Sequence, residues 1–240
     1  APNGMWEYLT SVYFLSHKDD DGQLDNTHFA AFLSKITAFI FAYALTNPGV
    51  NALRTPVYAE MLKVYAKQSC DFADFKFEED NLRKILANYK FTNNRSVTRS
   101  LITWFAFTFE GQERPSPHIS GFDIEHIYAK ERHNREKRLQ DPNKLEVLGN
   151  KILLEKSINI RASDYRFEDK KKHYNGYINA KGKKFPGSII VEYRQLTEKE
   201  DFTEVDIEER DQYIHNQFIA FLRQENLLQE DYPIQAGENI

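Results

Sequence analysis

The sequence predicts an α+β fold that is mostly α, and three patterns along the chain lead to this prediction. Up to residue 109, apolar side chains recur three and four residues apart, which is the spacing of one helix face. Two short apolar segments, 122–127 and 151–154, have the length of strands rather than helices. Near the end, Thr203 and Asp206 have the spacing of a helix capping box ahead of an amphipathic segment. We therefore expect a helical N-terminal region, a small core with two strands and a long C-terminal helix.

The helical part of the prediction depends on the residues that begin and end each segment. Thr27 is a suitable N-cap, and the Asn-Pro-Gly sequence at 47–49 interrupts the segment that follows it. Thr55 followed by Pro56 is a strong start signal, because proline fits the first turn of a helix. The helices expected in this region are 27–46, 55–65, 82–89 and 97–108.

The second half of the chain differs from the first in composition and in the length of its apolar segments. Residues 111–121 are rich in Pro, Gly and Ser and predict a loop, and residues 130–144 are charged and rich in turn formers. Residues 155–175 predict two short helical pieces, whereas 176–200 carries no pattern that assigns it. The change near residue 110 predicts two regions, 1–110 and 111–240.

The composition excludes several classes of protein. A hydrophobic share of 41% with 18 Phe and 13 Tyr is enough for a core, which excludes general disorder. The single cysteine, Cys70, excludes a disulfide framework and a four-thiolate zinc site, and it indicates a reducing compartment. The longest apolar stretch, 36–45, is shorter than the about 20 residues of a membrane-spanning helix, and the first residues lack the features of a secretion signal. We therefore expect a cytoplasmic protein with no membrane partner.

The charge is distributed unevenly along the chain. The net charge of -4 by itself argues against a nucleic-acid-binding protein. Residues 123–184, however, carry 16 Lys and Arg against 10 Asp and Glu, whereas residues 185–240 carry 4 against 13. The local field attracts a polyanion more than the net charge does, so the basic segment 123–184 is a candidate nucleic-acid-binding region. A solvated surface of mixed charge explains the same counts.

The residues with catalytic chemistry lie in the same basic segment. Glu125 and His126 lie near the end of the first expected strand, and Asn150 precedes the second. Asn159 follows Asn150 by nine residues, in the next expected helix. Neighbouring strand residues point to opposite faces, so Glu125 and His126 share a site only where the backbone leaves the sheet. A neutral His accepts a proton from water near pH 7, and carboxylate and amide oxygens suit Mg²⁺ or Mn²⁺. These residue types indicate phosphodiester hydrolysis.

The block resembles the HNH, or His-Me finger (ββα-metal), nuclease motif. It is more closely similar to the C-terminal nuclease domain of GmrSD-type, modification-dependent (type IV) restriction enzymes. The similarity is close over residues 122–175 and looser up to about residue 222. It implies an HNH-like nuclease domain in 111–240 and a helical linker or scaffold in 1–110 that joins it to an upstream domain. The matching patterns are Ile124-Glu-His-Ile127, Leu148-Gly-Asn-x-x-Leu-Leu154, Asn159 and Phe167-x-x-Lys170-x-x-x-Tyr174.

The resemblance also implies a role for each candidate residue. His126 would be the general base that activates water, and Glu125 and Asn159 would bind Mg²⁺ or Mn²⁺. Asn150 would orient the His126 ring or shape the hairpin, and Asp123 would be a polar group behind the metal ligands. The residues expected to contact DNA phosphates are Lys170 and Arg161.

The implied function is that of a metal-dependent DNA endonuclease of bacterial antiviral defence, a restriction system that acts on base-modified DNA. The implied partner is a ParB-like nucleotide-hydrolysing domain, upstream in the same chain or separate. One departure is Ala129, where relatives usually have Pro, and this puts the geometry of the loop in question. Two alternatives stay open: a catalytically inactive nuclease-fold scaffold, which Ala129 and the acidic C-terminal segment favour, and an RNA-cleaving toxin with the same motif.

Overall fold

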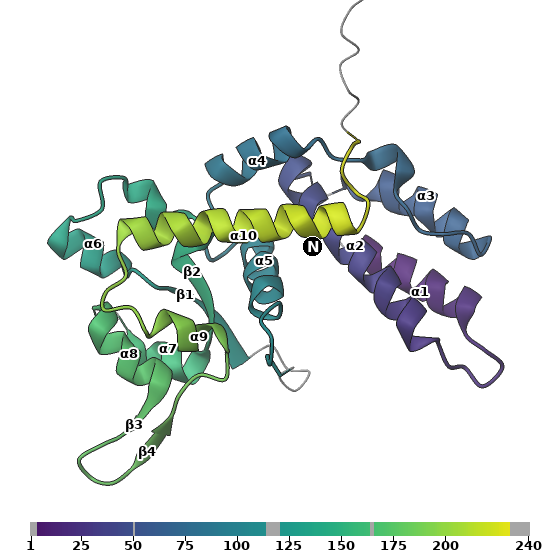
Figure 1. The fold of residues 1–240 in the computed structure, drawn as a ribbon. Coiled ribbons are helices and arrows are strands. Elements are labelled where there is room, and N and C mark those ends of the chain that lie inside the picture. The colour runs from purple at the N-terminus through teal and green to yellow at the C-terminus, as the bar shows by residue number, and fades with distance from the viewer. Residues whose placement is uncertain (1–3, 50, 114–120, 164–165, 231–240) are drawn as a thin grey trace, which may run out of the picture. The chain divides into compact units, whose positions relative to one another are not determined.

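The computed structural model describes residues 4–49, 51–113, 121–163 and 166–230, and contacts divide the chain into two compact units (Figure 1). The first unit contains the residues up to Leu86 and the segment from Phe218 on, and the second unit contains 87–217. The described residues form a mostly helical α+β fold that ends in a long helix, as the sequence predicts. The division into functional regions at residue 110 stays a prediction.

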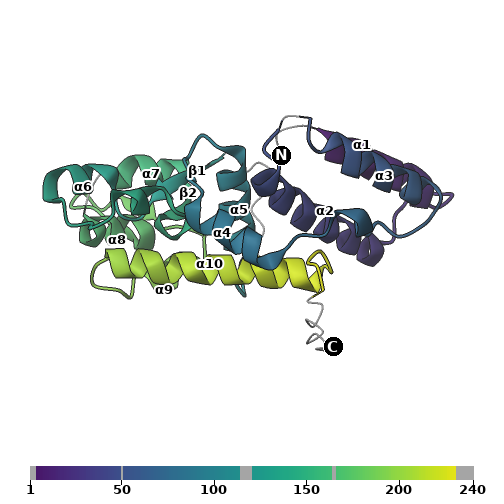
Figure 2. The same ribbon diagram turned by 90° about the horizontal axis from the view of Figure 1, so that it is seen from above.

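The first unit is helical. Its helix α2 begins at Asn26 and is capped by Asp25, whose side chain accepts a hydrogen bond of 2.8 Å from the His28 backbone, so the predicted cap at Thr27 is two residues too late. Helices α1 and α3 run side by side in this unit (Figure 2). The helices that begin in this unit are α1 (Met5–His17), α2 (Asn26–Thr46), α3 (Arg54–Tyr65) and α4 (Glu79–Asn88), with a 3-10 turn at Ala73–Phe75.

Helix α2 is the most apolar element of the first unit. Its Phe39 ring is fully buried and stacks on the Phe72 ring, with ring centroids 3.7 Å apart. Among the described residues, α2 is also the one helix that is long and apolar enough to cross a membrane. The apolar stretch 36–45 by itself does not indicate this, because it is too short to cross a membrane. A core helix of a water-soluble protein meets the same criteria, and Ile36 and Ala42 of this helix are buried within the protein.

The second unit combines helices with two small antiparallel sheets. Strands β1 (Phe122–His126) and β2 (Lys151–Glu155) pair with each other, and β3 (Gly176–Ile178) pairs with β4 (Lys184–Pro186). Helix α7 packs against β1, β2 and α8, and α5 packs against β2. The helices of this unit are α5 (Ser96–Ala106), α6 (Lys130–Glu136), α7 (Lys156–Ala162), α8 (Phe167–Asn175), α9 (Glu192–Leu196) and the part of α10 (Glu204–Gln224) up to residue 217.

Most of the predicted elements of this unit are present. Both predicted strands form, and the 155–175 segment divides into α7 and α8. At the start of α10 the Asp206 carboxylate accepts from the Thr203 backbone N–H at 2.7 Å, which is one of the two bonds of a capping box, and from the Thr203 hydroxyl at 2.6 Å. Two differences concern short elements. The charged 130–144 segment contains helix α6, which i,i+4 ion pairs such as Arg132–Glu136 support, and the unassigned 176–200 segment forms β3, β4 and α9. Residues 114–120 of the predicted loop lie outside the described residues.

Candidate active site

The β1–β2 hairpin determines which candidate side chains share a face. Strand register places His126 opposite Lys151 and Glu125 opposite Ile152. Because successive strand residues alternate between faces, Glu125 and Asp123 lie on one face and His126 on the other. The last residue of β1 and the first residue of β2 therefore form one polar pair at the end of the hairpin.

His126 is held in a cluster of charged groups. The Lys151 ammonium lies 2.5 Å from His126 Nε2 and also donates to Glu146 Oε2 at 2.7 Å and Asn93 Oδ1 at 2.8 Å. The Glu146 carboxylate lies 3.7 Å from His126 Nε2 and also binds the Lys130 ammonium. An ammonium group can only donate, so the imidazole accepts at Nε2 and is neutral in this arrangement.

The electrostatics of this cluster agree with a neutral histidine. Burial lowers the pKa of His126; the Glu146 carboxylate opposes this, and the Lys151 charge lowers the pKa further. Burial also lowers the pKa of Lys151 to about 8, against the attraction of Glu146. Burial acts to raise the pKa of Glu146, but the neighbouring His126 side chain and the ammonium groups of Lys130 and Lys151 hold it well below its ordinary value.

Four members of the cluster were missed at the sequence level: Asn93, Lys130, Glu146 and Lys151. Lys151 follows Asn150 directly, but the predicted strands 122–127 and 151–154 paired end to end place it opposite Ile127, one residue from the observed partner His126. Glu146 ends a 3-10 turn (Pro142–Glu146), and Asn93 lies in a turn before α5, so neither carries a local signal. Only the packing of the second unit brings these two residues to His126.

Glu125 occupies the other face of β1 and is paired with a lysine. Its carboxylate forms a buried ion pair with Lys170 of α8, whose ammonium also donates to the backbone carbonyl of His126 at 2.7 Å. Lys170 is 1% exposed. Lys170, which is predicted to contact a phosphate, thus binds Glu125, which is predicted to bind the metal. Lys170 also links α8 to the end of β1.

Asn150 acts on the backbone that follows β1. Its side chain accepts from the Tyr128 backbone at 2.7 Å, and its amide group donates to the carbonyls of Tyr128 at 3.1 Å and Leu145 at 3.3 Å. The backbone carbonyl of Asn150 accepts from Ile127 at 3.0 Å. Of the two roles predicted for Asn150, these contacts correspond to shaping the hairpin.

The other candidate residues lie on the same supersecondary unit. Asp123 is half-buried on β1 opposite Leu154, and Asn159 is half-buried on α7, the helix that packs against both strands. Arg161, also on α7, donates to the Pro186 carbonyl at 3.3 Å, and its guanidinium lies over the Phe185 ring. Arg161 therefore supports the β3–β4 hairpin.

Two of the candidate side chains have the donor chemistry that a metal ion needs. The Glu125 carboxylate and the Asn159 amide supply oxygen atoms, which suit Mg²⁺ or Mn²⁺. Among the described residues there is no group of three or more His, Cys, Asp and Glu side chains that could hold a metal ion. The chemistry of the two donors fits a hard cation, but the Lys170 ammonium occupies the Glu125 carboxylate.

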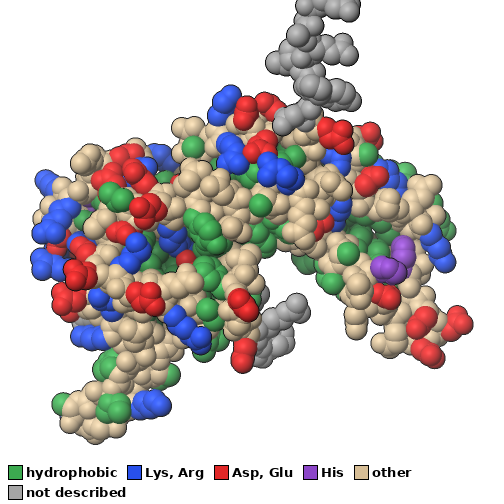
Figure 3. Space-filling view, in the orientation of Figure 1, with side chains coloured by type: hydrophobic (Ala, Val, Ile, Leu, Met, Phe, Trp, Pro, Cys, Tyr) green, Lys and Arg blue, Asp and Glu red, His purple; other side chains and the backbone are tan. Residues whose placement is uncertain are grey.

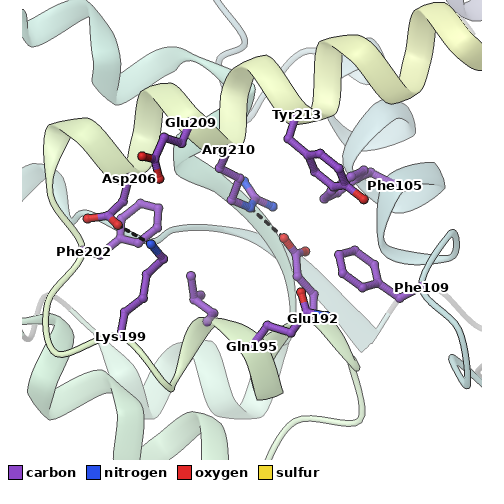
Figure 4. Close-up of a pocket in the computed structure, with 11 residues that line it drawn as sticks. Phe105, Phe109, Glu192, Gln195, Lys199, Phe202, Asp206, Glu209, Arg210 and Tyr213 are labelled. Carbon is purple, nitrogen blue, oxygen red and sulfur yellow. Dashed lines mark hydrogen bonds and ion pairs between the residues drawn. The ribbon is translucent and has the colours of Figure 1, made fainter.

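A separate pocket of about 250 Å³ lies between α5, α9 and α10 in the second unit (Figure 4). The Arg210–Glu192 ion pair, 2.6 Å long, crosses it, and the rings of Phe105, Phe109 and Tyr213 lie on one side. None of the predicted site residues lines this pocket. The Arg210 guanidinium also donates to the Leu148 and Gly149 carbonyls at 2.9 Å and so links α10 to the backbone ahead of β2.

Comparison with known proteins places the second unit in a described family. The family model described as GmrSD restriction endonucleases, C-terminal domain, matches residues 70–217. This range contains the β1–β2 hairpin, the His126 cluster and helices α5 to α9. No curated protein and no solved structure matches the chain.

Proposed function

The chain belongs to the family of GmrSD restriction endonuclease C-terminal domains, and from this premise we propose that it hydrolyses DNA phosphodiester bonds by an HNH-type mechanism with His126 as the general base. The observation that carries the proposal is the position of His126. A neutral imidazole ends β1 of a β1–β2–α7 unit, inside the segment that matches a restriction-endonuclease domain.

In the proposed reaction, His126 takes a proton from a water molecule that attacks the phosphorus atom. The bond between phosphorus and the 3′ oxygen breaks, which leaves a 5′ phosphate and a 3′ oxygen that takes up a proton. The Nε2 lone pair of His126 is engaged by Lys151, so proton transfer at this atom requires the Lys151 ammonium to withdraw. Glu146 and Asn93 already accept hydrogen bonds from the Lys151 ammonium, so they can hold it after it leaves the imidazole.

Glu125 and Asn159 are the residues that would hold Mg²⁺ or Mn²⁺ in this proposal. A divalent ion bound there would neutralise charge on the phosphate and on the leaving oxygen. Lys170 has to release the Glu125 carboxylate for this purpose, and the His126 carbonyl remains as an acceptor for its ammonium. The Lys170 ammonium thus competes with a metal ion for the Glu125 carboxylate.

The same ion pair favours a second candidate function, a catalytically inactive nuclease-fold scaffold. A carboxylate that is permanently neutralised by a buried lysine would leave the fold intact and the metal site unused. The two functions differ in two measurable properties, which are DNA cleavage and the affinity of the chain for Mn²⁺.

Cleavage and metal binding test the proposal together. The chain is incubated with unmodified and base-modified duplex DNA in the presence of Mg²⁺ or Mn²⁺, with and without a ParB-like nucleotide-hydrolysing domain. We expect His126→Ala to abolish cleavage with an unchanged melting temperature, while the exposed His28→Ala retains full activity. Calorimetric titration should show Mn²⁺ binding that Glu125→Gln removes. Cleavage by the His126→Ala variant at the wild-type rate would disprove the proposal, and lack of both Mn²⁺ binding and cleavage would identify the scaffold.

A further inference from the structure

The β3–β4 hairpin carries lysines and no carboxylate of its own. From Lys170 to Val191 the chain has six lysines and no Asp or Glu, although the whole chain has 36 acidic residues. Three of these lysines, at 181, 183 and 184, lie in the turn and on β4 and are exposed. Hydrophobic, Lys and Arg side chains are visible on this projecting hairpin in Figure 3.

Other lysines of the second unit are neutralised by carboxylates. Ion pairs hold the ammonium groups of Lys130, Lys144, Lys151, Lys170 and Lys199. Within the described part of the chain, no carboxylate pairs with the lysines of the hairpin. The positive field of the hairpin is therefore available to an anionic partner.

The two faces of the hairpin differ. The Tyr177 and Phe185 rings stack with centroids 4.9 Å apart, and the Arg161 guanidinium of α7 and the His173 ring of α8 lie against them. Their register neighbours, Ile178 and Lys184, belong to the opposite face, where Ile178 is 68% exposed. One face thus packs on the helices, and the other presents a lysine and an aliphatic side chain to solvent.

The base of the hairpin is tied to the strand that carries Lys151. A Cβ atom at Gly176 would lie 2.5 Å from the Gly187 nitrogen, so the two chain segments approach each other as closely as glycine allows. The Ser188 hydroxyl and the Ile189 backbone donate to the Glu155 carboxylate at the end of β2, at 2.8 and 2.6 Å. An isolated two-stranded hairpin is only marginally stable, so the β3–β4 hairpin depends on such contacts. The contacts to Glu155 also fix its position relative to the β1–β2 hairpin.

We propose that the β3–β4 hairpin is a DNA-binding element that contacts the phosphate backbone of duplex DNA through Lys181, Lys183 and Lys184. This inference rests on the proposed function for the choice of DNA as the polyanion. A two-stranded β-ribbon has the width of the major groove of B-form DNA, whereas the major groove of an RNA duplex is too narrow for it. Lysine contacts to phosphates supply affinity that depends on salt and not on base sequence.

Fluorescence anisotropy with a 30-base-pair unmodified duplex tests the inference. Binding is measured in EDTA, so that cleavage does not contribute, over a range of salt concentrations. The hairpin variant combines Lys181→Ala, Lys183→Ala and Lys184→Ala. The control variant combines Lys18→Ala, Arg54→Ala and Lys90→Ala, which removes the same three charges from exposed positions elsewhere.

We expect the hairpin variant to bind at least about tenfold more weakly at low salt. The slope of log Kd against log salt should fall by about 0.9 for each phosphate that a lysine no longer neutralises. The control variant should bind within about twofold of the wild type. An equal decrease of affinity in both variants, or unchanged affinity in the hairpin variant, would overturn the inference. An effect on a structured RNA probe without an effect on the duplex DNA would also overturn it.

The outcome is separable from that of the proposed function. The three hairpin lysines are not among the residues proposed for catalysis, so binding and cleavage are read from different variants. If cleavage depends on His126 but the affinity for DNA does not depend on the hairpin lysines, only the hairpin inference fails. If the hairpin lysines control binding and the chain never cleaves, the hairpin inference stands and the catalytic proposal fails.

Discussion

Lys151 lies directly opposite His126 in the β1–β2 register, and its ammonium contacts the imidazole Nε2 at 2.5 Å. Lys151 is fully buried, and Glu146 and Asn93 hold its other hydrogens. The contact keeps the imidazole neutral and engages the same lone pair that a general base needs. The pair therefore links the protonation state of His126 to the position of a single buried lysine.

Replacing this lysine should change the titration of His126. In Lys151→Met the positive charge next to the imidazole is absent while the Glu146 carboxylate remains, so we expect the pKa of His126 to rise. Cleavage that requires a neutral His126 would then lose activity at a higher pH than in the wild type, because protonation of the base begins earlier as the pH falls. NMR titration of the imidazole measures the pKa directly, and a pH–rate profile measures its effect on activity.

Lys130→Met is the matched control for this change. Lys130 binds the same carboxylate but is about half exposed, and its charge has a smaller influence on the pKa of His126. Its removal should raise that pKa by less than the removal of Lys151 does. A His126 pKa that stays constant or falls in Lys151→Met would contradict the geometry of the cluster.

Asn150 is expected to matter for the loop after β1 rather than for the imidazole. Asn150→Ala leaves the Tyr128 backbone N–H without its acceptor in a fully buried position, so the free energy of unfolding should fall by about 2 kcal/mol or more. Urea denaturation measures this decrease. The exposed Asn143→Ala serves as the control and should change stability by less than about 0.5 kcal/mol. Equal effects from both substitutions would show that the Asn150 contacts contribute little.

Gly149 is expected to tolerate no side chain. A Cβ atom there would overlap the Ile207 carbonyl oxygen and lie 2.7 Å from Asp211 Cβ of helix α10, so the hairpin and the helix would have to move apart. We expect Gly149→Ala to destabilise the chain by about 1–3 kcal/mol or more. Gly121→Ala, at a position with no atom within 4 Å of the new Cβ, should leave the melting temperature unchanged. A Gly149→Ala variant with wild-type stability would show that this close packing is not required.

The sequence by itself determined the elements with a clear period or a clear end signal. Hydrogen bonding and burial within one element depend on nearby residues, so local patterns predict such elements. These are the helices at 27–46 and 97–108, the strands at 122–127 and 151–154, and the start of the C-terminal helix at Thr203. The resemblance that pointed to a GmrSD-type nuclease domain is of the same local kind, and the family match over residues 70–217 confirms it. The predicted roles of His126 and Asn159 are local assignments as well, and they stay predictions.

The tertiary structure alone decided which charged groups meet. Sequence spacing cannot show that Lys170 reaches Glu125 across 45 positions, or that Asn93 and Lys151 meet 58 positions apart. It also left β3 and β4 unassigned, because a three-residue strand is stabilised by its partner and by the helices beneath it more than by its own residues. Ion pairs and short sheets depend on contacts between distant segments, and the packing of the second unit is what brings those segments together.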